Sequence, residues 1–546
     1  MLTNCMPVLG MGYTAKYIGK SGLSDCVVGE WGKRKEEKKM YDLLHFRRQF
    51  LLSNGLIDEL QSWQHRQVGD VHLFAHPDLE ITIEVGSSAS VLLLGYIFDP
   101  VHPEKSNEDI VSDILSRVAS LEELLVAIKP YAGRYALLYQ DDHAFTILHD
   151  PLGIREIYYC TQPNRVICGS QPNLMDAFSD PKLGVTKNKG ILHFYKHDMK
   201  LVRSGRLWVG DETYYQGVKH LMPNHYLSIR SLTVKRYWPN KRLERIDLDT
   251  AVKQSCDYLR GIMKAVTSRF DVMMAVTSGI DSRSLMAASI EIQNRIYYFI
   301  NKHPRHNDIK ADIRIPKDMF KKLNIPFHIH DVEAQVDEEF RKIFQDNVFT
   351  STDLILPVIY NVYYKKHQYK VNLLGVGEIG RDYFGEAPHD LDGYYLARCL
   401  KYKHSSYATA QCEKWLQEVR ELAKECNVDI MQLFLWEGLL ANWGAVGNSE
   451  SDIAIEEFDP YDSHYIYEIM LSVFRDHGRT GRDEFFEMMF NELWPELLEF
   501  PFNPPDTISD WLKNWLQRMG LFHHLKRQRY RLDRWRYNRL INGAQE

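Results

Sequence analysis

Asp271-Val-Met-Met-Ala-Val-Thr-Ser-Gly-Ile-Asp-Ser-Arg-Ser-Leu-Met-Ala-Ala-Ser-Ile290 is the stretch of sequence from which the fold can be predicted. Residues 271–276 are an apolar run of strand length, residues 277–283 are polar and mostly small, and apolar residues recur at helical spacing from Ser284. A strand that enters a helix through such a turn leaves several backbone N–H groups at the helix start without partners. Together with the positive end of the helix dipole, these donors form a site suited to phosphate.

The side chains of this turn also favour a phosphate ligand. Ser278 and Ser282 add hydroxyl donors, and Gly279 lets the chain approach a ligand closely. Asp281 would repel phosphate unless a cation lay between them, so we predict that it binds Mg²⁺. The predicted ATP and pyrophosphate contacts are Thr277, Ser278, Gly279, Asp281, Ser282 and Arg283. The alternative is a plain strand–turn–helix with a capping Asp or Ser, which would be preferred for an isolated turn.

This turn is similar to the pyrophosphate loop of the N-type ATP pyrophosphatases, which usually reads Ser-Gly-Gly-x-Asp-Ser. Here the sequence is Thr277-Ser-Gly-Ile-Asp-Ser282, so Ser278 replaces the first Gly of the motif. The turn lacks a Walker Lys and does not match the dinucleotide fingerprint. The chain as a whole resembles the asparagine synthetase family within that group, and the resemblance covers nearly all of it.

Strands and helices alternate around the turn. A helix over 251–269, strands over 295–300 and 327–332, and a helix over 309–323 predict a doubly wound parallel sheet that binds its ligand at the carboxyl ends of the strands. In the family, the strand after the loop helix meets adenine, which implies that Phe299 and Ile300 lie near the base. Asp308 heads the next helix, where capping is its default role.

A second Gly-rich turn lies in Lys370-Val-Asn-Leu-Leu-Gly-Val-Gly-Glu-Ile-Gly-Arg-Asp-Tyr-Phe-Gly385. It resembles the family's Gly-Glu-Gly-Ala-Asp-Glu loop, and more closely a variant that reads Gly-Glu-x-x-Arg. The resemblance implies that Glu378 is a catalytic acid and the second Mg²⁺ ligand; a one-residue shift would transfer this role to Asp382. It also implies ATP contacts at Gly375 and Gly377. A solvated surface turn is the alternative.

Two features near the C-terminus have open interpretations. Relatives carry a Lys at a fixed distance before a Pro, where it stabilises charge as the adenylate is attacked, and this chain has Arg482 at that spacing. Guanidinium can neutralise phosphate but cannot give up a proton, and a solvated helix residue is an equally good interpretation. Residues 506–546 form a basic, amphipathic tail that could touch anionic lipid, RNA or an acidic partner. Docking on its own domain or an oligomer contact is preferred.

Residues 1–240 resemble the class II glutamine amidotransferase domain, notably in Asp150-Pro-Leu-Gly-Ile-Arg155. The implied fold is an α+β, Ntn-type antiparallel sandwich. The family hydrolyses glutamine with an N-terminal Cys whose own α-amine is the base. Here the first Cys is Cys5, and the family's Asn-Gly-Glu run is replaced by Leu94-Gly95-Tyr96. We therefore predict that this half hydrolyses no glutamine unless the chain is trimmed to Cys5.

Bulk properties agree with a protein of two domains and a tail. The chain has 546 residues, a net charge of −6 and eight scattered Cys without a Cys-x-x-Cys pair, as expected for reduced thiols in a cytoplasm. No apolar run reaches the ~18 residues of a membrane span, and the start of the sequence lacks a signal-peptide pattern. The predicted domains are 1–240, amidotransferase-like, and 250–505, ATP-binding, followed by the tail at 506–546.

The resemblance implies an ATP-dependent carbon–nitrogen ligase that forms AMP and pyrophosphate, with ATP and Mg²⁺ as cofactors. A carboxylate of a small molecule or peptide would be adenylated, and ammonia or an amine would then displace AMP. With the glutaminase residues missing, a tailoring reaction is expected rather than asparagine synthesis from glutamine. A catalytically inactive ATP-binding relative with a scaffold or regulatory role is the alternative. A ligase acting on RNA has only the tail in its favour, so nucleic acid is not expected as a partner, while a homodimer stays open.

Overall fold

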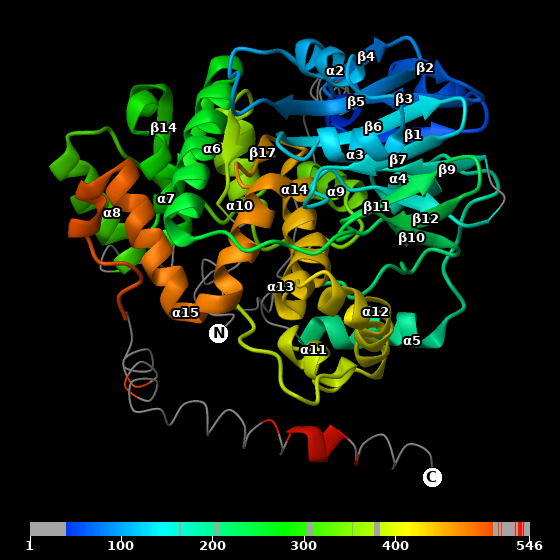
Figure 1. The fold of residues 1–546 in the computed structure, drawn as a ribbon. Coiled ribbons are helices and arrows are strands. Elements are labelled where there is room, and N and C mark those ends of the chain that lie inside the picture. Colours follow the sequence, from blue (N-terminus) through cyan, green and yellow to red (C-terminus); the bar gives the residue numbers. More distant parts are fainter. Residues whose placement is uncertain are drawn as a thin grey trace, which may run out of the picture.

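A computed structural model describes residues 40–162, 165–201, 207–302, 310–351, 353–375 and 383–505, and in the tail residues 512, 515, 530, 533–537 and 539. Two antiparallel sheets of six strands occupy the first part of the chain, and a parallel sheet of five strands lies further along (Figure 1). The fold is therefore a mixture of α/β and α+β parts, as predicted. Within the described residues, none of the helices combines the length and apolarity needed to cross a membrane.

The two antiparallel sheets pack face to face as a sandwich. The strands of the first sheet, in spatial order, are β10 (Val218–His220), β8 (Tyr158–Cys160), β9 (Val166–Gly169), β1 (Phe50–Ser53), β3 (Val71–Ala75) and β2 (Gln64–Val68). Those of the second are β12 (Thr233–Arg236), β11 (His225–Ser228), β7 (Phe145–His149), β6 (Ala132–Asp141), β5 (Ala89–Phe98) and β4 (Ile81–Val85). Leu52 and Leu73 of the first sheet share a core with Leu92, Leu138 and Leu227 of the second.

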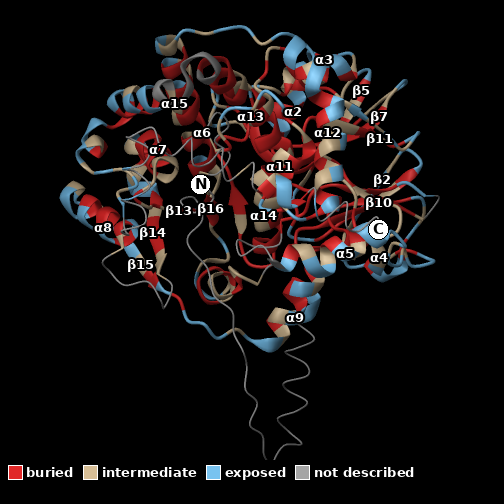
Figure 2. Cartoon of the chain, turned by 90° about the horizontal axis from the view of Figure 1, so that it is seen from below, coloured by how far each residue is buried: buried red, intermediate tan, exposed pale blue. Residues whose placement is uncertain are grey.

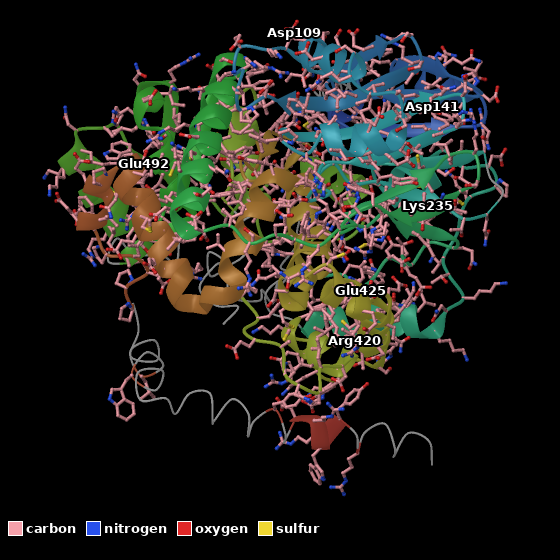
Figure 3. The ribbon with its side chains drawn as sticks, viewed as in Figure 1. Asp109, Asp141, Lys235, Arg420, Glu425 and Glu492 are labelled. Carbon is pink, nitrogen blue, oxygen red and sulfur yellow. The ribbon has the colours of Figure 1, made fainter. Side chains whose placement is uncertain are left out.

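Two helices cover the outer face of the second sheet, where the sequence predicts one helical stretch over 110–128. They are α2 (Asn107–Leu115) and α3 (Leu121–Ala127). Ser106 starts α2 with a capping box that includes Asp109, at the top edge in Figure 3. Ser120 starts α3, because its side chain accepts a hydrogen bond from the Glu123 N–H. The small polar residues between the helices therefore split the predicted stretch.

The parallel sheet has the strand order of a doubly wound fold. Its strands, in spatial order, are β15 (His328–Asp331), β14 (Ile296–Lys302), β13 (Val272–Ala275), β16 (Val371–Leu373) and β17 (Glu456–Phe458). Each neighbouring pair is parallel. The chain proceeds outward in one direction from β13 to β15 and in the other from β16 to β17. Such a reversal creates a crevice at the carboxyl ends of the two central strands, where doubly wound sheets bind their ligands.

Helices lie on both faces of this sheet, and two separate apolar clusters mark the two faces. One cluster takes in α6 (Leu248–Arg269), α7 (Ile280–Ala288) and α8 (Ala311–Leu323). The other takes in α9 (Glu338–Asn347) and η5 (Ile359–His367). The first cluster continues into the N-terminal half, so the two halves of the chain share one core, with exposed residues on the outer surfaces (Figure 2).

A helical lobe lies between β16 and β17 in the sequence. Its helices are α11 (Gly393–Cys399), α12 (Ser406–Glu425), α13 (Ile430–Phe434), η6 (Leu435–Gly444) and α14 (Ala445–Ser451). The long helix α15 (His464–Leu493) follows β17 and packs against α6 and α7. The segment from Leu433 to Leu440 is rich in Leu and Trp, and Leu433, Trp436 and Leu440 are buried. The shorter helices are η1 (Asp58–Leu60), α4 (Pro172–Ala177), α5 (Lys189–His193), η2 (Phe194–Asp198), η3 (Met199–Leu201), η4 (Ile290–Arg295), α10 (Leu356–Val358) and η7 (Pro495–Glu499).

The described tail residues dock on α11. Asp533 is 4% exposed and forms ion pairs with Arg398 at 3.3 Å and Lys403 at 3.2 Å. Arg534 pairs with Asp392 at 2.6 Å. The tail thus contacts its own chain, as preferred in the sequence analysis, and Figure 1 shows its red helical segment beside the yellow helical lobe.

A pair of buried acids joins the two halves of the chain. Asp150 ends the hairpin of β6 and β7, and Asp462 lies directly before α15; both are fully buried. The Leu152 N–H donates to Asp462 Oδ1 at 2.8 Å, and the carboxylate of Asp150 lies close enough to act on Asp462 electrostatically. Burial and the charge of Asp150 raise the pKa of Asp462 well above its ordinary value. Two segments that are distant in the sequence therefore meet at a carboxyl group whose pKa is raised.

We expect Asp462→Asn to gain stability relative to the wild type as the pH rises. The folded state holds the Asp462 proton more tightly than the unfolded state, so the wild type loses unfolding free energy above the unfolded pKa of about 3.9. The amide has no proton to lose. The difference in unfolding free energy should grow by at most about 1.4 kcal/mol per pH unit between about pH 5 and 8, measured by urea denaturation.

Asp109→Asn is the matched control, because the Ser106 N–H lowers the pKa of that exposed carboxylate. It stays ionised over the same range, so its effect should not change with pH. A constant difference for Asp462→Asn as well would contradict a raised pKa of Asp462 in the folded chain.

Candidate functional site

The turn after β13 is held together by its own side chains. The Thr277 N–H donates to Ser282 Oγ at 3.0 Å, and the Gly279 N–H donates to Thr277 Oγ1 at 3.1 Å. Gly279 is the N-cap of α7 in an extended conformation, and it offers no side-chain cap. The helix therefore begins at Ile280, four residues earlier than the apolar spacing predicts, and Asp281 and Ser282 lie in its first turn. Such a helix start presents backbone donors to an anion.

Asp312 contacts this turn, and the sequence analysis missed it. The Ser278 N–H and Ser278 Oγ both donate to Asp312 Oδ1, at 3.2 and 2.6 Å. Asp312 lies in the first turn of α8, because that helix begins at Ala311. A predicted helix start at 309 directs attention to Asp308, which lies outside the described residues.

Gly375, the first glycine of the second Gly-rich turn, lies against the first turn at the switch point of the sheet. β13 and β16 are neighbours, and the turns follow their carboxyl ends. A Cβ built on Gly375 would lie 2.8 Å from the carbonyl oxygen of Asp281 and 3.4 Å from Leu285 Cδ1. The structure therefore brings Gly375 against the start of α7, with room only for glycine. Gly377, Glu378 and Asp382 lie outside the described residues.

Gly375→Ala is expected to weaken the binding of Mg²⁺–ATP, because the new methyl group must push the two turns apart. We expect roughly a tenfold loss, the equivalent of about 1.4 kcal/mol, in isothermal titration. Gly447→Ala is a suitable control, since nothing lies within 4 Å of a Cβ at that position. Equal affinities for Gly375→Ala and the wild type would contradict a ligand held by both turns.

Arg283, one of the predicted ATP contacts, makes structural contacts with a distant segment of the chain. Its side chain is fully buried and donates to the carbonyl oxygens of Pro501 at 3.0 Å, Phe500 at 2.9 Å and Leu497. The guanidinium also lies 3.6 Å from the centre of the Phe502 ring. These contacts are more than 200 residues away in the sequence, so they cannot be seen in the motif. They tie α7 to the segment that follows α15.

Phe299 and Ile300 lie in the centre of the sheet. Phe299 is fully buried in the cluster beneath α9 and η5, and its carbonyl oxygen accepts the Val276 N–H at 2.9 Å. Ile300 is 7% exposed. The side chain of Phe299 is thus turned into the core, so any adenine contact would depend on the backbone end of β14.

Arg482 lies on α15, which packs against both α6 and α7. Its guanidinium donates to the neighbouring Asp483 at 2.9 Å, and its side chain is 15% exposed. It is thus neither a freely solvated residue nor one committed to a buried partner.

The Leu94-Gly95-Tyr96 run is built into the contact between the halves. All three residues belong to β5, and the Tyr96 hydroxyl donates to the Glu457 carbonyl oxygen of β17 at 3.2 Å. Gly95 has φ +107°, and a Cβ there would lie 2.2 Å from the Arg134 carbonyl oxygen. An apolar ring and a tight backbone contact therefore stand where the family has an amide and a carboxylate. Cys5 lies outside the described residues.

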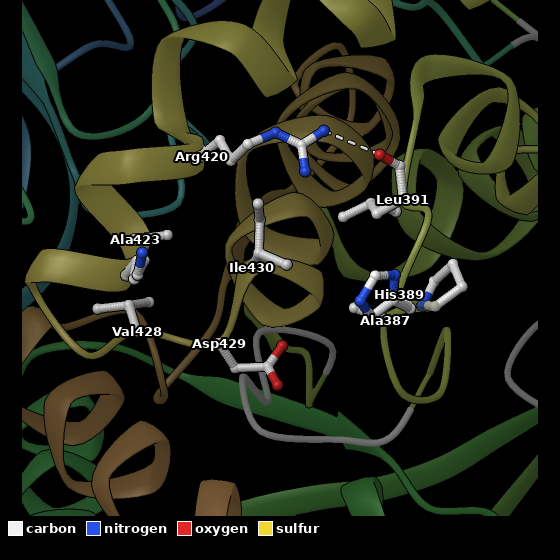
Figure 4. A pocket seen from close by; sticks show the side chains of 10 residues that line it. Ala387, His389, Leu391, Arg420, Ala423, Val428, Asp429 and Ile430 are labelled. Carbon is white, nitrogen blue, oxygen red and sulfur yellow. Dashed lines mark hydrogen bonds between the residues drawn. The ribbon is translucent and has the colours of Figure 1, made fainter.

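Two open hollows lie elsewhere on the surface. The first, of about 340 Å³, lies between α12 and the segment before α11; Arg420 donates across it to the Leu391 carbonyl oxygen at 2.8 Å (Figure 4). The second, of about 280 Å³, lies beside Trp238 and Arg242. None of the predicted site residues lines either hollow. Within the described part of the chain, no group of three or more His, Cys, Asp or Glu side chains could hold a metal ion.

Comparisons with known proteins find no family model and no curated protein that match the chain. Among solved structures, the chain is similar to a glutamine phosphoribosylpyrophosphate amidotransferase from B. subtilis complexed with ADP and GMP. The identity is 11%, the match covers 64% of this chain and 74% of that chain, and the TM-score is 0.22. The chain is also similar to a structure described as the allosteric regulatory enzyme of purine biosynthesis. The identity is 11%, the match covers 66% of this chain and 74% of that chain, and the TM-score is 0.23.

Proposed function

We propose that the chain is an asparagine synthetase-like, ATP-dependent carbon–nitrogen ligase. It adenylates a substrate carboxylate, releases pyrophosphate, and transfers ammonia or an amine to the acyl group with release of AMP. The observation that carries the proposal is the contact between Gly375 and the start of α7 at the switch point of a doubly wound sheet. A PP-loop relative needs both turns at one place, because the phosphates and their cation touch both.

The residues of the two turns fit Mg²⁺–ATP. The start of α7 and the hydroxyl groups of Thr277, Ser278 and Ser282 would bind the phosphates, with Gly279, Gly375 and Gly377 allowing close approach. Asp281 and Glu378 would hold the Mg²⁺, which neutralises phosphate charge when bound. The backbone of Phe299 and Ile300 would lie near the base. Arg283 is not among the proposed ATP contacts, because its guanidinium donates to carbonyl oxygens of the 497–501 segment.

Catalysis in this proposal is positioning and charge neutralisation. The substrate carboxylate attacks the α-phosphorus of ATP, the bond to the pyrophosphate oxygen breaks, and an acyl-adenylate forms. The amine nitrogen then attacks the acyl carbon, loses a proton, and AMP leaves. Arg482 would stabilise negative charge during the second step, while a base other than arginine must take the proton.

The nitrogen donor in this proposal is free ammonia or a substrate amine. The burial of Tyr96 against β17 supports a first half without glutaminase activity that persists as the structural partner of the second half. The carboxylate belongs to a small molecule or a peptide.

The test is release of pyrophosphate from ATP by the purified chain with a panel of carboxylates. We expect release that requires Mg²⁺ and a carboxylate, and amide formation with ammonium but not with glutamine. Amide formation from glutamine at the same rate as from ammonium would contradict the proposed loss of glutaminase activity. Binding of ATP without pyrophosphate release in any combination would favour the second candidate.

That second candidate is an ATP-binding relative without turnover, with a scaffold or regulatory role. The contact of Asp312 with both donors of Ser278 favours it, because a carboxylate there competes with phosphate for the same N–H and O–H groups. In that case Asp312→Ala should tighten Mg²⁺–ATP binding in isothermal titration without creating turnover. Weaker binding in this variant would mean that Asp312 positions Ser278 for the nucleotide.

A further inference from the structure

Four aromatic and imidazole rings stack beside the edge strand of the parallel sheet. Tyr297 of β14 stacks on His328 of β15 with ring centres 4.1 Å apart and planes at 7°. The Tyr297 hydroxyl lies 3.0 Å from His330 Nε2, and His330 stacks on His367 at 5.2 Å and 24°. His328 is exposed, so the stack ends in a ring with a face open to solvent.

Positive charge surrounds these rings. Lys366 is exposed, and Lys370 Nζ lies 5.8 Å from the centre of the Tyr297 ring. Between these lysines Tyr369 is 85% exposed. Burial, together with His367, Lys366 and His328, lowers the pKa of His330 to about 4. The pKa of His367 is lowered likewise, by burial and by Lys370, Lys366 and His328.

The acidic side chains of this region do not cancel that charge. Asp331 is occupied by Lys302 at 3.6 Å. Asp271 is exposed at the start of β13, where its carbonyl oxygen accepts the Val371 N–H, but it is not among the groups that shift the two histidines. A chain with a net charge of −6 therefore carries a local cationic surface.

This ring surface lies away from the proposed ATP site. Tyr297 and His328 are at the amino ends of β14 and β15, and Lys370 directly precedes β16. The two Gly-rich turns follow the carboxyl ends of β13 and β16. Because the strands are parallel, the ring surface lies at the amino ends of the strands and the turns lie at their carboxyl ends. A nucleotide bound at the turns would therefore not cover the ring surface.

We propose that the ring surface, made of Tyr297, His328, His367, Tyr369, Lys366 and Lys370, binds single-stranded nucleic acid. A base would continue the stack on His328, the exposed Tyr369 ring would take a second base, and the two lysines would contact phosphates. Stacked rings beside cations are the combination that single-stranded nucleic acids require. Among the described residues of this surface, Tyr369 is the one large exposed apolar side chain, which is too little apolar area for a lipid bilayer.

The test measures fluorescence anisotropy of a labelled oligouridylate with the full chain. We expect binding that weakens steeply between about 50 and 200 mM salt, as phosphate contacts release counterions. Lys366→Glu with Lys370→Glu should weaken binding at least about tenfold, and His328→Ala and Tyr369→Ala about fivefold or more each, as for lost base stacking. All four positions are at the surface, so unchanged thermal melting is expected and checks the fold.

Lys317→Glu with Lys321→Glu is the matched control, because both lysines are exposed on α8 and the net charge changes equally. This variant should bind within about twofold of the wild type, since long-range charge effects are screened. Absence of binding by the wild type, or equal losses in the two double variants, would overturn the proposal. A further result would also overturn the proposal: heparin displaces the oligouridylate, and neither His328→Ala nor Tyr369→Ala changes the affinity for it. That result would indicate that the surface binds a polyanion without base stacking.

Discussion

Replacing Arg134 by methionine is expected to lower the free energy of unfolding by about 3–5 kcal/mol, which is the usual cost of breaking a buried ion pair on one side. Arg134 is fully buried on β6 and forms a bidentate pair with Asp452, with both distances at 2.7 Å. It also donates to Glu456 at 3.2 Å. Without this guanidinium, the buried carboxylates of Asp452 and Glu456 would lose part of the positive charge that stabilises them in the shared core of the two halves.

The rest of the network shows why the effect should be large. Arg155 Nη2 contacts Glu456 at 2.5 Å, and Arg48 Nε lies 3.1 Å from the same carboxylate. Burial opposes ionisation of Glu456, but Arg155, Arg134 and Arg48 together hold its pKa at about 2. The network therefore depends on all three cations being present at once.

Two variants check this interpretation by urea denaturation. Arg260→Met removes the exposed pair with Glu492, labelled on the outer surface in Figure 3, and should cost less than about 1 kcal/mol. Arg134→Met combined with Asp452→Leu removes both charges and should recover at least half of the loss. A cost for Arg134→Met as small as that for Arg260→Met would show that the buried pair contributes little to stability.

The second large effect concerns activity. Asp281→Ala is expected to reduce ATP-dependent pyrophosphate release at least about 100-fold, because it removes one of the two proposed metal ligands from the phosphate site. The free energy of unfolding should change little, since the side chain lies at the helix start and is only partly buried. Pyrophosphate release and urea denaturation, measured on the same preparation, separate the two effects.

Asp318→Ala is the control for this prediction, because Asp318 is an exposed carboxylate on α8. It should retain the activity of the wild type. If Asp281→Ala released pyrophosphate as fast as Asp318→Ala, the turn after β13 would not be the phosphate site.

Local patterns were enough to predict the framework of the second half. The apolar run at 271–276, the small residues after it and the later alternation gave β13, α7, β14, α8 and β15 within a few residues. The strand of residues 371–373 was also expected, and with β13 it defines the switch point. These elements are periodic and long enough for their own residues to determine them.

Contacts between distant residues could not be predicted. The partners of Arg283 lie more than 200 residues away, and those of Arg134 more than 300 residues away. The short strands β1, β2 and β17 owe their conformation to pairing with neighbouring strands rather than to their own sequence. Their sequences therefore contain no pattern from which they could be predicted. Asp312 was missed because an error of a few residues at a helix start exchanges one acid for another.

The most direct test of the central claim is a crystal structure of the chain with Mg²⁺ and a non-hydrolysable ATP analogue. We predict the phosphates at the start of α7, with carboxylate oxygens of both Asp281 and Glu378 about 2.1 Å from one Mg²⁺ ion. A nucleotide bound away from the switch point, or a metal ion that touches neither carboxylate, would contradict the account.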